Sequence, residues 1–396
     1  MSEGDERRAV TAPGGRGTSE RPSERSSAVT VASPGRALAA RFASGSRLSR
    51  YTLLAIGILI ALGLPWFVYP PVALDIVIFA LFAMALDLLL GYTGLLSFGH
   101  AAFFGSAAYV AGLVSLHLEL PYPLAVLAGT VFAVLLAIPI GYLSVKRSGI
   151  YFAMVTLAFA QMVYYVANQW RSVTGGENGL QGVPRLFPGV DLRDPFYFYY
   201  AALPLLVIGV AIAWRTVHSP FGKVLVAIRD NPDRVRALGY PVAHYKLLAF
   251  VISAGLSGIA GSLYSLTHFF ASLDAVDWSM SGKVVVITVL GGAGTLWGSV
   301  ISSALIVILE NRLSLAGFNG QEIVIGSIFV IVVLAFRRGI WGTIAYLLAR
   351  WSRPPSASSS TPALAPEPAI GPTTPDAAEE PPAAPVDGRD PASHGR

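Results

Sequence analysis

Cysteine is absent from the 396-residue chain, which excludes disulfide bonds, thiolate metal sites and cysteine nucleophiles. Charged residues are scarce: they make up 13% of the sequence, against roughly 25% in soluble domains, whereas hydrophobic residues make up 54%. No Walker-type phosphate loop occurs, so we expect any ATP to be used by another polypeptide. We expect no metal or cofactor in this chain. The N-terminal region also lacks the apolar core and cleavage site of a secretory signal.

The charges that are present crowd toward the two ends of the chain. Residues 1–49 are rich in Arg, Ser and Gly, and residues 351–396 in Pro, Ala and Ser. Such segments cannot bury enough apolar surface to offset chain entropy, so we expect two disordered cytoplasmic tails. The transmembrane domain is predicted to occupy residues 50–350. The net charge of +5 does not indicate nucleic-acid binding, because the basic residues flank apolar runs.

Long apolar segments fill the region between the tails. About 20 apolar residues cross a bilayer as a helix. The sequence therefore predicts an all-α, polytopic transmembrane bundle with discontinuous or re-entrant glycine-rich segments. The candidate spans are 51–69, 71–90, 101–119, 122–145, 150–169, 197–214, 247–268 and 321–336, plus the longer stretch 283–309.

Basic residues beside the spans predict the orientation. Arginines within 36–50, the pair Lys146–Arg147 and the loop 216–246 all fall on one side of the membrane when the spans are counted. By the positive-inside rule this side is the cytoplasm. The loop 170–196 then lies outside. We therefore expect a multi-pass membrane protein with a cytoplasmic N-terminus.

The stretch 283–309 is too short for two full spans. If it crossed once, Arg337–Arg338 would lie outside, against the positive-inside rule. If Gly291–Gly298 interrupts it, those arginines lie inside. We therefore predict two short or re-entrant segments that meet at this glycine-rich turn, and a cytoplasmic C-terminus.

The segment Gly91–Gly105 is unusual for a lipid-facing helix, since it combines glycines with Thr93, Ser97 and His100. Broken backbone at membrane depth is tolerated only inside protein or along a watery cavity. This pattern predicts a discontinuous helix that lines a translocation pathway. The alternative is close helix packing by small residues. His100 by itself is more typical of a hydrogen-bonded structural residue than of a ligand.

A second segment, Gly149–Gln161, contributes two polar side chains. Thr156 and Gln161 are five residues apart and share a helix face only loosely, and hydrogen bonding between helices is the commoner role of such residues. Thr174–Gly179 reads as a turn-rich outer loop that either receives a donor protein or connects two spans. The candidate pathway residues are Tyr92, Thr93, Gly94, Ser97, His100, Phe103, Thr156 and Gln161.

The cytoplasmic loop contains the signals of a short helix. Asn231 can cap it, Pro232 suits its first turn, Asp233 favours the positive end of the dipole, and Gly239 ends it. This helix either lies on the membrane surface or docks with a cytoplasmic partner. The candidate docking residues are Asp230, Asn231, Asp233, Arg234, Arg236, Ala237, Leu238 and Gly239.

Asp75 and Asp87 lie within a predicted span, where acidic residues are functional candidates. Asp87 is one helical turn before Gly91 and could stabilise the break there. The sequence shows no basic partner for either acid. With His100, these acids form the basis of an alternative hypothesis, a proton-driven secondary transporter that acts without an ATPase.

Taken together, residues 50–345 resemble the LivM type of permease from branched-chain amino acid ABC importers. Four motifs in order carry the resemblance: Gly91–Gly105, Gly149–Gln161 together with Thr174–Gly179, the loop Ser219–Gly239 continuing into Lys246–Phe250, and Gly291–Gly298. The resemblance implies a transport subunit, not an enzyme, that moves branched-chain or related amino acids by alternating access. It also implies a second permease of LivH type, two ATP-binding subunits and an extracytoplasmic substrate-binding protein.

In this family the helix 230–239 would be the coupling helix that docks in the ATPase. Arg234, Val235 and Arg236 depart from the small and acidic residues that are common there, which favours a matched, distinct ATPase partner. Relatives with other substrates leave open an ABC permease for urea or aromatic acids. A structural membrane protein without transport is disfavoured, because glycine-rich breaks would only weaken a plain bundle.

Overall fold

The computed structural model describes residues 47–189, 191–317, 323–324, 326–327 and 330. Residues 1–46 and 351–396 of the two predicted tails lie outside the described residues, as does most of the predicted span 321–336. Helix α2 begins at Arg47, so residues 47–49, which we expected in the N-terminal tail, are helical.

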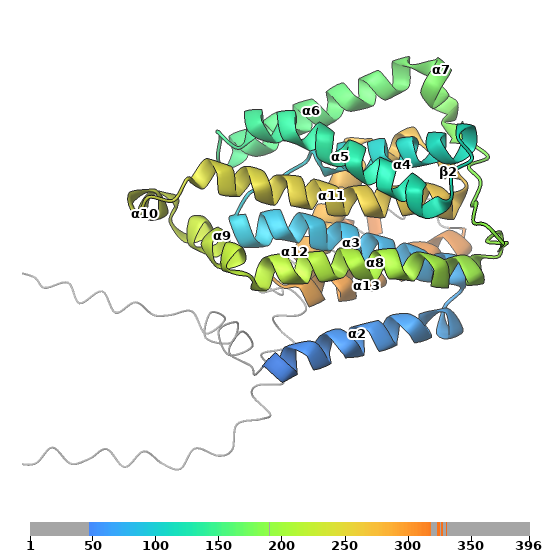
Figure 1. Ribbon diagram of the computed structural model, residues 1–396, viewed down its shortest axis with the longest axis horizontal. Helices are drawn as coiled ribbons and strands as arrows, with labels where there is room; N and C mark the ends of the chain where they lie inside the picture. The colour runs from blue at the N-terminus through green and yellow to red at the C-terminus, as the bar shows by residue number, and fades with distance from the viewer. Residues whose placement is uncertain (1–46, 190, 318–322, 325, 328–329, 331–396) are drawn as a thin grey trace, which may run out of the picture. The chain divides into compact units, whose positions relative to one another are not determined.

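Helices make up nearly all of the described chain, and the long ones run roughly side by side (Figure 1). The long helices are α2 (Arg47–Phe67), α3 (Pro70–Thr93), α4 (His100–His117), α5 (Tyr122–Ser144), α6 (Ile150–Gln169), α8 (Pro195–His218), α11 (Val242–His268), α12 (Trp278–Gly291) and α13 (Leu296–Leu315). Within the described residues, six of them are long and apolar enough to span a membrane: α3, α5, α6, α8, α11 and α13. The predicted all-α polytopic fold is confirmed.

Short elements connect the long helices. They are α7 (Arg171–Thr174), the 3₁₀ turns η1 (Gly176–Asn178) and η2 (Leu273–Ala275), α9 (Pro220–Asp230), α10 (Pro232–Ala237), and the strands β1 (Leu180–Gln181) and β2 (Phe270–Ala271). The two strands pair antiparallel, with Leu180 opposite Ala271. This pairing ties the loop after α6 to the connection between α11 and α12.

Helix α3 forms the centre of the bundle and contacts α11, α13, α8 and α12. In its most apolar 18-residue window, 89% of the residues are buried inside the chain. A helix that is apolar all round is expected in such a position, because every face packs against protein. The residues that follow α3 are therefore held by a fixed scaffold.

Small residues bring α11 close to its neighbours α4 and α5. A Cβ atom added at Gly261 would collide with the carbonyl of Phe104 in α4, and one added at Gly258 would lie 2.8 Å from the Cβ atom of Ala133 in α5. Small residues let membrane helices approach closely, so that dispersion contacts between backbones replace the missing hydrophobic driving force.

Two glycine-rich breaks interrupt the helices. Between α3 and α4, Gly94 adopts a φ of 73°, and between α12 and α13, Gly292 and Gly294 adopt φ values of 102° and 86°. These left-handed conformations favour glycine because a Cβ atom would be strained there. The predicted interruption within 283–309 is confirmed. Only α12, with 14 residues, is short, since α13 has 20 and is long enough to span.

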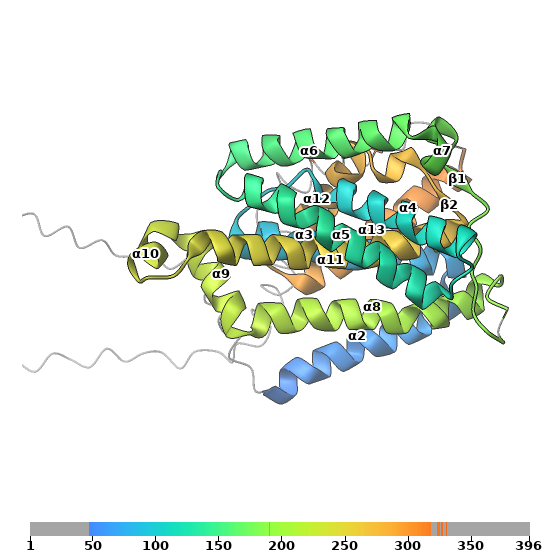
Figure 2. The same ribbon diagram turned by 45° about the horizontal axis from the view of Figure 1, so that its top comes forward.

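The connections fall at two opposite ends of the bundle. Helices α9 and α10 lie at one end and α7 and β2 at the other in both views, with β1 beside β2 (Figure 2). Helix α6 begins and α8 ends on the side of α9, so Lys146–Arg147 and Arg215 share that end. The basic connections that we assigned to one side of the membrane are thus grouped in space.

Candidate functional site

The break between α3 and α4 is held by a chain of hydrogen bonds through His100. Its Nδ1 lies 3.0 Å from the Ser97 hydroxyl, and its Nε2 lies 2.7 Å from the Ser253 hydroxyl. Ser253 donates its single hydroxyl hydrogen to the carbonyl of Ala85, so it accepts from Nε2. The backbone amide of Gly99 donates to Ser97 at 3.2 Å. Both ring nitrogens are therefore occupied, as the structural interpretation of His100 predicts.

Other candidate pathway residues also pair within the chain. Thr93 donates to a carbonyl one turn earlier, and Thr156 accepts from the amide of Phe98 at 3.3 Å. Phe103 is fully buried, with its ring 6.0 Å from that of His100. Gln161 is exposed on α6, so the structure does not bring it together with Thr156. Direct contact of these residues with a substrate stays a prediction.

The two breaks meet at Gly91 and Gly294. Asp87 Oδ1 accepts a hydrogen bond of 2.6 Å from the amide of Gly294, and the Tyr92 hydroxyl donates to the Gly294 carbonyl at 3.1 Å. The Arg229 guanidinium donates to the Gly91 carbonyl. We call these five residues the glycine junction. It joins the end of α3, the turn between α12 and α13, and the last turn of α9.

The glycine junction satisfies backbone groups that the helix breaks would leave unpaired at membrane depth. Asp87 therefore stabilises the distant break at Gly294 in addition to lying one turn before Gly91. Its second oxygen, Oδ2, has no hydrogen-bond partner among the described residues. The positive charge that acts on this buried carboxylate is Arg229.

The predicted coupling helix is present as α10. The Asn231 side chain accepts a hydrogen bond of 2.9 Å from the amide of Arg234, which is the expected capping contact. Val235 is buried against Ile228 of α9 and Val242 of α11, which anchors the helix. Leu238 is 71% exposed. The predicted short helix is thus confirmed, and its docking role stays a prediction.

The exposed surface of α10 and its flanks gathers all the residues that we predicted for docking. Arg236 forms an ion pair of 2.8 Å with Asp233 on this surface. The preceding helix α9 was not predicted; Ser219 caps it by accepting from the amide of Gly222 at 3.3 Å. Helix α9 ends at Asp230, directly after Arg229, so α10 follows the glycine junction closely along the chain. The exposed residues are Asp230, Asn231, Asp233, Arg234, Arg236, Ala237, Leu238 and Gly239.

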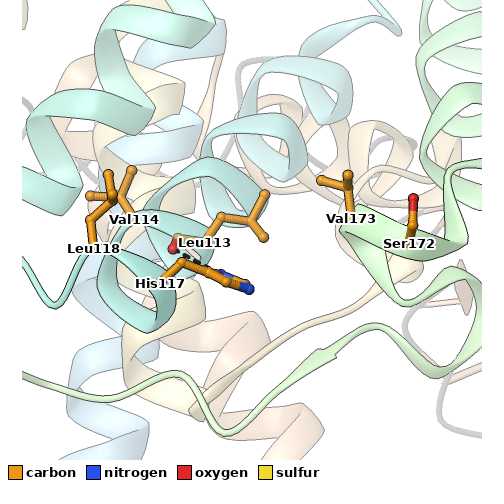
Figure 3. A pocket seen from close by; sticks show the side chains of 6 residues that line it. All are labelled: Leu113, Val114, His117, Leu118, Ser172 and Val173. Carbon is orange, nitrogen blue, oxygen red and sulfur yellow. Dashed lines mark hydrogen bonds between the residues drawn. The ribbon is translucent and has the colours of Figure 1, made fainter.

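A hollow of about 340 Å³ lies between α4 and α7 (Figure 3). Its walls are mainly apolar, and its imidazole, from His117, already pairs through Nδ1 with the Leu113 carbonyl at 3.3 Å. Ser172 supplies the other polar side chain. Sites for small molecules need several convergent polar groups, so this hollow does not carry a candidate substrate site.

The family model described as "Branched-chain amino acid transport system / permease component" matches residues 71–333. The chain belongs to this family. The matched residues include both helix breaks, the glycine junction and α10. This permease is thus a multi-pass inner-membrane protein of the branched-chain amino acid transport permease family, and its relatives are transport subunits.

Two relatives are the high-affinity branched-chain amino acid transport system permease proteins LivM of Salmonella typhimurium and Escherichia coli. Each is 27% identical over 293 residues, which cover 66% of this chain and 67% of the relative. The ribose import permease protein RbsC of Bacillus subtilis is 27% identical over 152 residues, covering 35% of this chain and 47% of that protein. No solved structure matched the chain.

The expectation that Asp75 and Asp87 lack a basic partner is wrong for this permease. Asp75 Oδ1 lies 3.0 Å from His268 Nε2, and Arg229 acts on Asp87. Asp75 and His268 are 193 residues apart, so no local pattern indicated the pair.

Sequence reasoning also missed Arg185, which is 7% exposed. Its guanidinium donates to the carbonyls of Leu266, at 2.7 Å, and Thr267, at 2.5 Å, in the last turn of α11. It also lies between the rings of Phe198 and Phe269. A cation is favourable at the negative end of a helix dipole. Burial lowers the pKa of Arg185 to about 10, so it remains charged at neutral pH. Nothing in the sequence indicated that Arg185 binds the end of α11, because it is a single arginine in a loop that looks like a simple connection.

Proposed function

We propose that this permease is a transmembrane subunit of an ATP-driven importer that carries branched-chain or related amino acids across the bacterial inner membrane by alternating access. The observation that carries the proposal is the continuous path from α10, which is capped and exposed, through Arg229 to the glycine junction. A docking helix at one end of this path can bias both helix breaks at the other. A two-state equilibrium shifts only when a ligand or partner binds one state more tightly.

The proposal includes partners of defined kinds. A second permease of LivH type would form the other wall of the pathway, two ATP-binding subunits would hydrolyse ATP, and an extracytoplasmic substrate-binding protein would deliver the amino acid. The chain itself would need no cofactor. In this arrangement the end with α9 and α10 and both termini face the cytoplasm.

A proton-driven carrier that acts alone is the second candidate. The Asp75–His268 pair favours it, because an acid and an imidazole 3.0 Å apart can exchange a proton. The occupied ring of His100 and the internal bonds of Asp87 disfavour a relay through those two residues.

Affinity purification of the full chain from its native membrane, followed by reconstitution into proteoliposomes, separates the two candidates. We expect a second permease and two ATP-binding subunits to co-purify. Leucine uptake should require ATP on the side of the vesicle membrane that α10 and the ATP-binding subunits face. Uptake by the chain alone, driven by a proton gradient and indifferent to ATP, would establish the second candidate instead. An importer for urea or aromatic acids would show ATP-dependent uptake of those compounds but not of leucine.

A further inference from the structure

A second, larger cavity lies between α3, α11, α12 and α13. Its volume of about 630 Å³ falls within the roughly 300–1,000 Å³ typical of small-molecule sites. Unlike the hollow between α4 and α7, it is lined by charged side chains of both signs. The charged residues in its wall are Asp75, His268, Asp274, Lys283 and Glu310.

Two of these charges form an ion pair within the described residues. Lys283 Nζ lies 2.6 Å from Glu310 Oε2, and the two side chains are 26% and 25% exposed. Lys283 Nζ also lies 4.2 Å from the centre of the Phe79 ring. Phe79 is the tenth residue of α3, about 14 Å along the helix at 1.5 Å per residue. The pair therefore lies beside the apolar middle of α3.

The remaining charges lie toward the end of the bundle that carries β2. His268 is the last residue of α11, and its pair with Asp75 leaves the two side chains 37% and 21% exposed. Asp274 in η2 is exposed beside them. The cavity thus holds two charged pairs whose side chains are all partly exposed. Charged residues among membrane-spanning helices are costly and are functional candidates by default.

Apolar side chains line the cavity next to the ion pair. They come from α3, α12 and α13: Val72, Phe79, Met280, Val286, Ile306 and Val307. A free amino acid carries one ammonium, one carboxylate and a side chain on a single carbon. The cavity offers a partner for each: Glu310 for an ammonium, Lys283 for a carboxylate, and this wall for an aliphatic side chain.

We propose that this cavity is a substrate-contact site of the transmembrane pathway, selective for zwitterionic amino acids with apolar side chains. The proposal rests on the proposed function and names the residues that meet the substrate. On entry, the zwitterion inserts between Lys283 and Glu310 and replaces their mutual ion pair with two new ones. Each charge of the protein and of the substrate is paired in the bound state, which offsets the cost of taking the zwitterion out of water. An uncharged sugar has no ammonium or carboxylate to pair with Glu310 and Lys283, so the ion pair between these two residues stays intact.

Uptake by the reconstituted complex tests the proposal, with radiolabelled leucine and ribose as probes. We expect Lys283→Gln and Glu310→Gln each to lower leucine uptake about tenfold or more, the loss of one charge-assisted hydrogen bond. The exchanged double variant, Lys283→Glu with Glu310→Lys, restores the ion pair but presents the two charges in reversed order. It should regain the yield and melting temperature of the unmodified complex without regaining leucine uptake.

Recovery of uptake together with stability in the exchanged variant would show that the pair is structural and would overturn the proposal. So would normal uptake in both single variants. If the unmodified complex transports ribose and not leucine, the proposed function itself fails. The two failures are therefore distinguishable.

Labelling of introduced cysteines gives an independent readout, because the chain has no cysteine of its own. Ser279→Cys places a thiol in the cavity wall, and Ser172→Cys places a matched thiol in the hollow between α4 and α7. We expect leucine, but not ribose, to slow modification at position 279 by a water-soluble thiol reagent, with position 172 unaffected. Equal rates with and without leucine, in a complex that transports leucine, would contradict the proposal.

Discussion

At the scale of single residues, the contact between Gly91 and Gly294 is the tightest feature of the glycine junction. A Cβ atom at Gly91 would lie 2.6 Å from the Cα of Gly294 and would also press on Asp87. Neither neighbour can move away easily, because the Gly294 atoms belong to the backbone and the Asp87 side chain is held by its hydrogen bond to the Gly294 amide. The contact therefore has no room to relax.

We expect Gly91→Ala to lower the stability of the protein by about 1–3 kcal/mol, which is the usual cost of overpacking. Gly282→Ala is the matched control, since no atom lies within 4 Å of the added Cβ and the site is helical. The control should be neutral or slightly stabilising, by up to about 1 kcal/mol. Thermal denaturation of the purified proteins in detergent measures both, and equal melting temperatures would contradict the tight contact.

Arg185 provides a second prediction at this scale. Arg185→Met keeps the apolar contact with Phe198 and Phe269 but leaves the carbonyls of Leu266 and Thr267 without their donor. We expect a loss of about 1–3 kcal/mol for unsatisfied buried groups. Arg185→Lys should recover only part of it, because an ammonium cannot reproduce the fork of donors. The same melting experiment, with the exposed Arg193→Lys as control, checks this.

At the scale of elements, α10 is held by its cap and by Val235, while its charges face outward. Reversal of the charge of Arg234 and Arg236 to Glu should therefore leave the fold intact. If α10 docks with the ATPase, the variant should co-purify with less ATP-binding subunit and show lower ATP-dependent uptake. Arg147→Glu, at the same end of the bundle and also exposed, is the control.

Unchanged recovery of the ATP-binding subunits in the Arg234→Glu/Arg236→Glu variant would remove α10 from the docking surface. Equal losses in this variant and in Arg147→Glu would point to general electrostatic attraction, which is screened by salt. A repeat of the purification at high ionic strength separates that case from specific docking.

The α12–α13 hairpin shows why the charge of Lys283 is hard to interpret from sequence. Lys283 and Glu310 stand at opposite ends of one apolar stretch and look like flanking charges. The turn at Gly292–Thr295 folds the stretch back, so the two side chains meet 2.6 Å apart. The local sequence thus predicts the break, but it does not predict the contact that the break creates.

At the scale of the whole molecule, the two ends of the bundle should face opposite sides of the membrane. Gly182 lies in the loop after β1, and Tyr240 lies just after α10. We expect Gly182→Cys to react with a membrane-impermeant maleimide in intact cells, and Tyr240→Cys to react only after the membrane is opened. Labelling of position 240 alone in intact cells would show that the orientation is reversed. Labelling of both positions would contradict the prediction that the two ends face opposite sides.

The sequence by itself determined the features that depend on local physics. Apolar runs of spanning length predicted the helices, glycines predicted both breaks, and Asn231 with Pro232 predicted the start of α10. Each follows from hydrophobic transfer, φ preference or a side chain that bonds its own backbone. The predicted pathway residues Ser97 and His100 lie at a break as expected, although their polar atoms pair inside the chain.

Only the tertiary structure decided which distant groups meet. It joined Asp87 to Gly294, Asp75 to His268 and Arg185 to the end of α11, across separations of 207, 193 and 81 residues. It also showed that α9 connects α10 to the glycine junction. Such contacts depend on how whole helices pack, and the spacing of residues along one helix carries no information about its partner. The charged cavity therefore became visible only when four helices were placed around it.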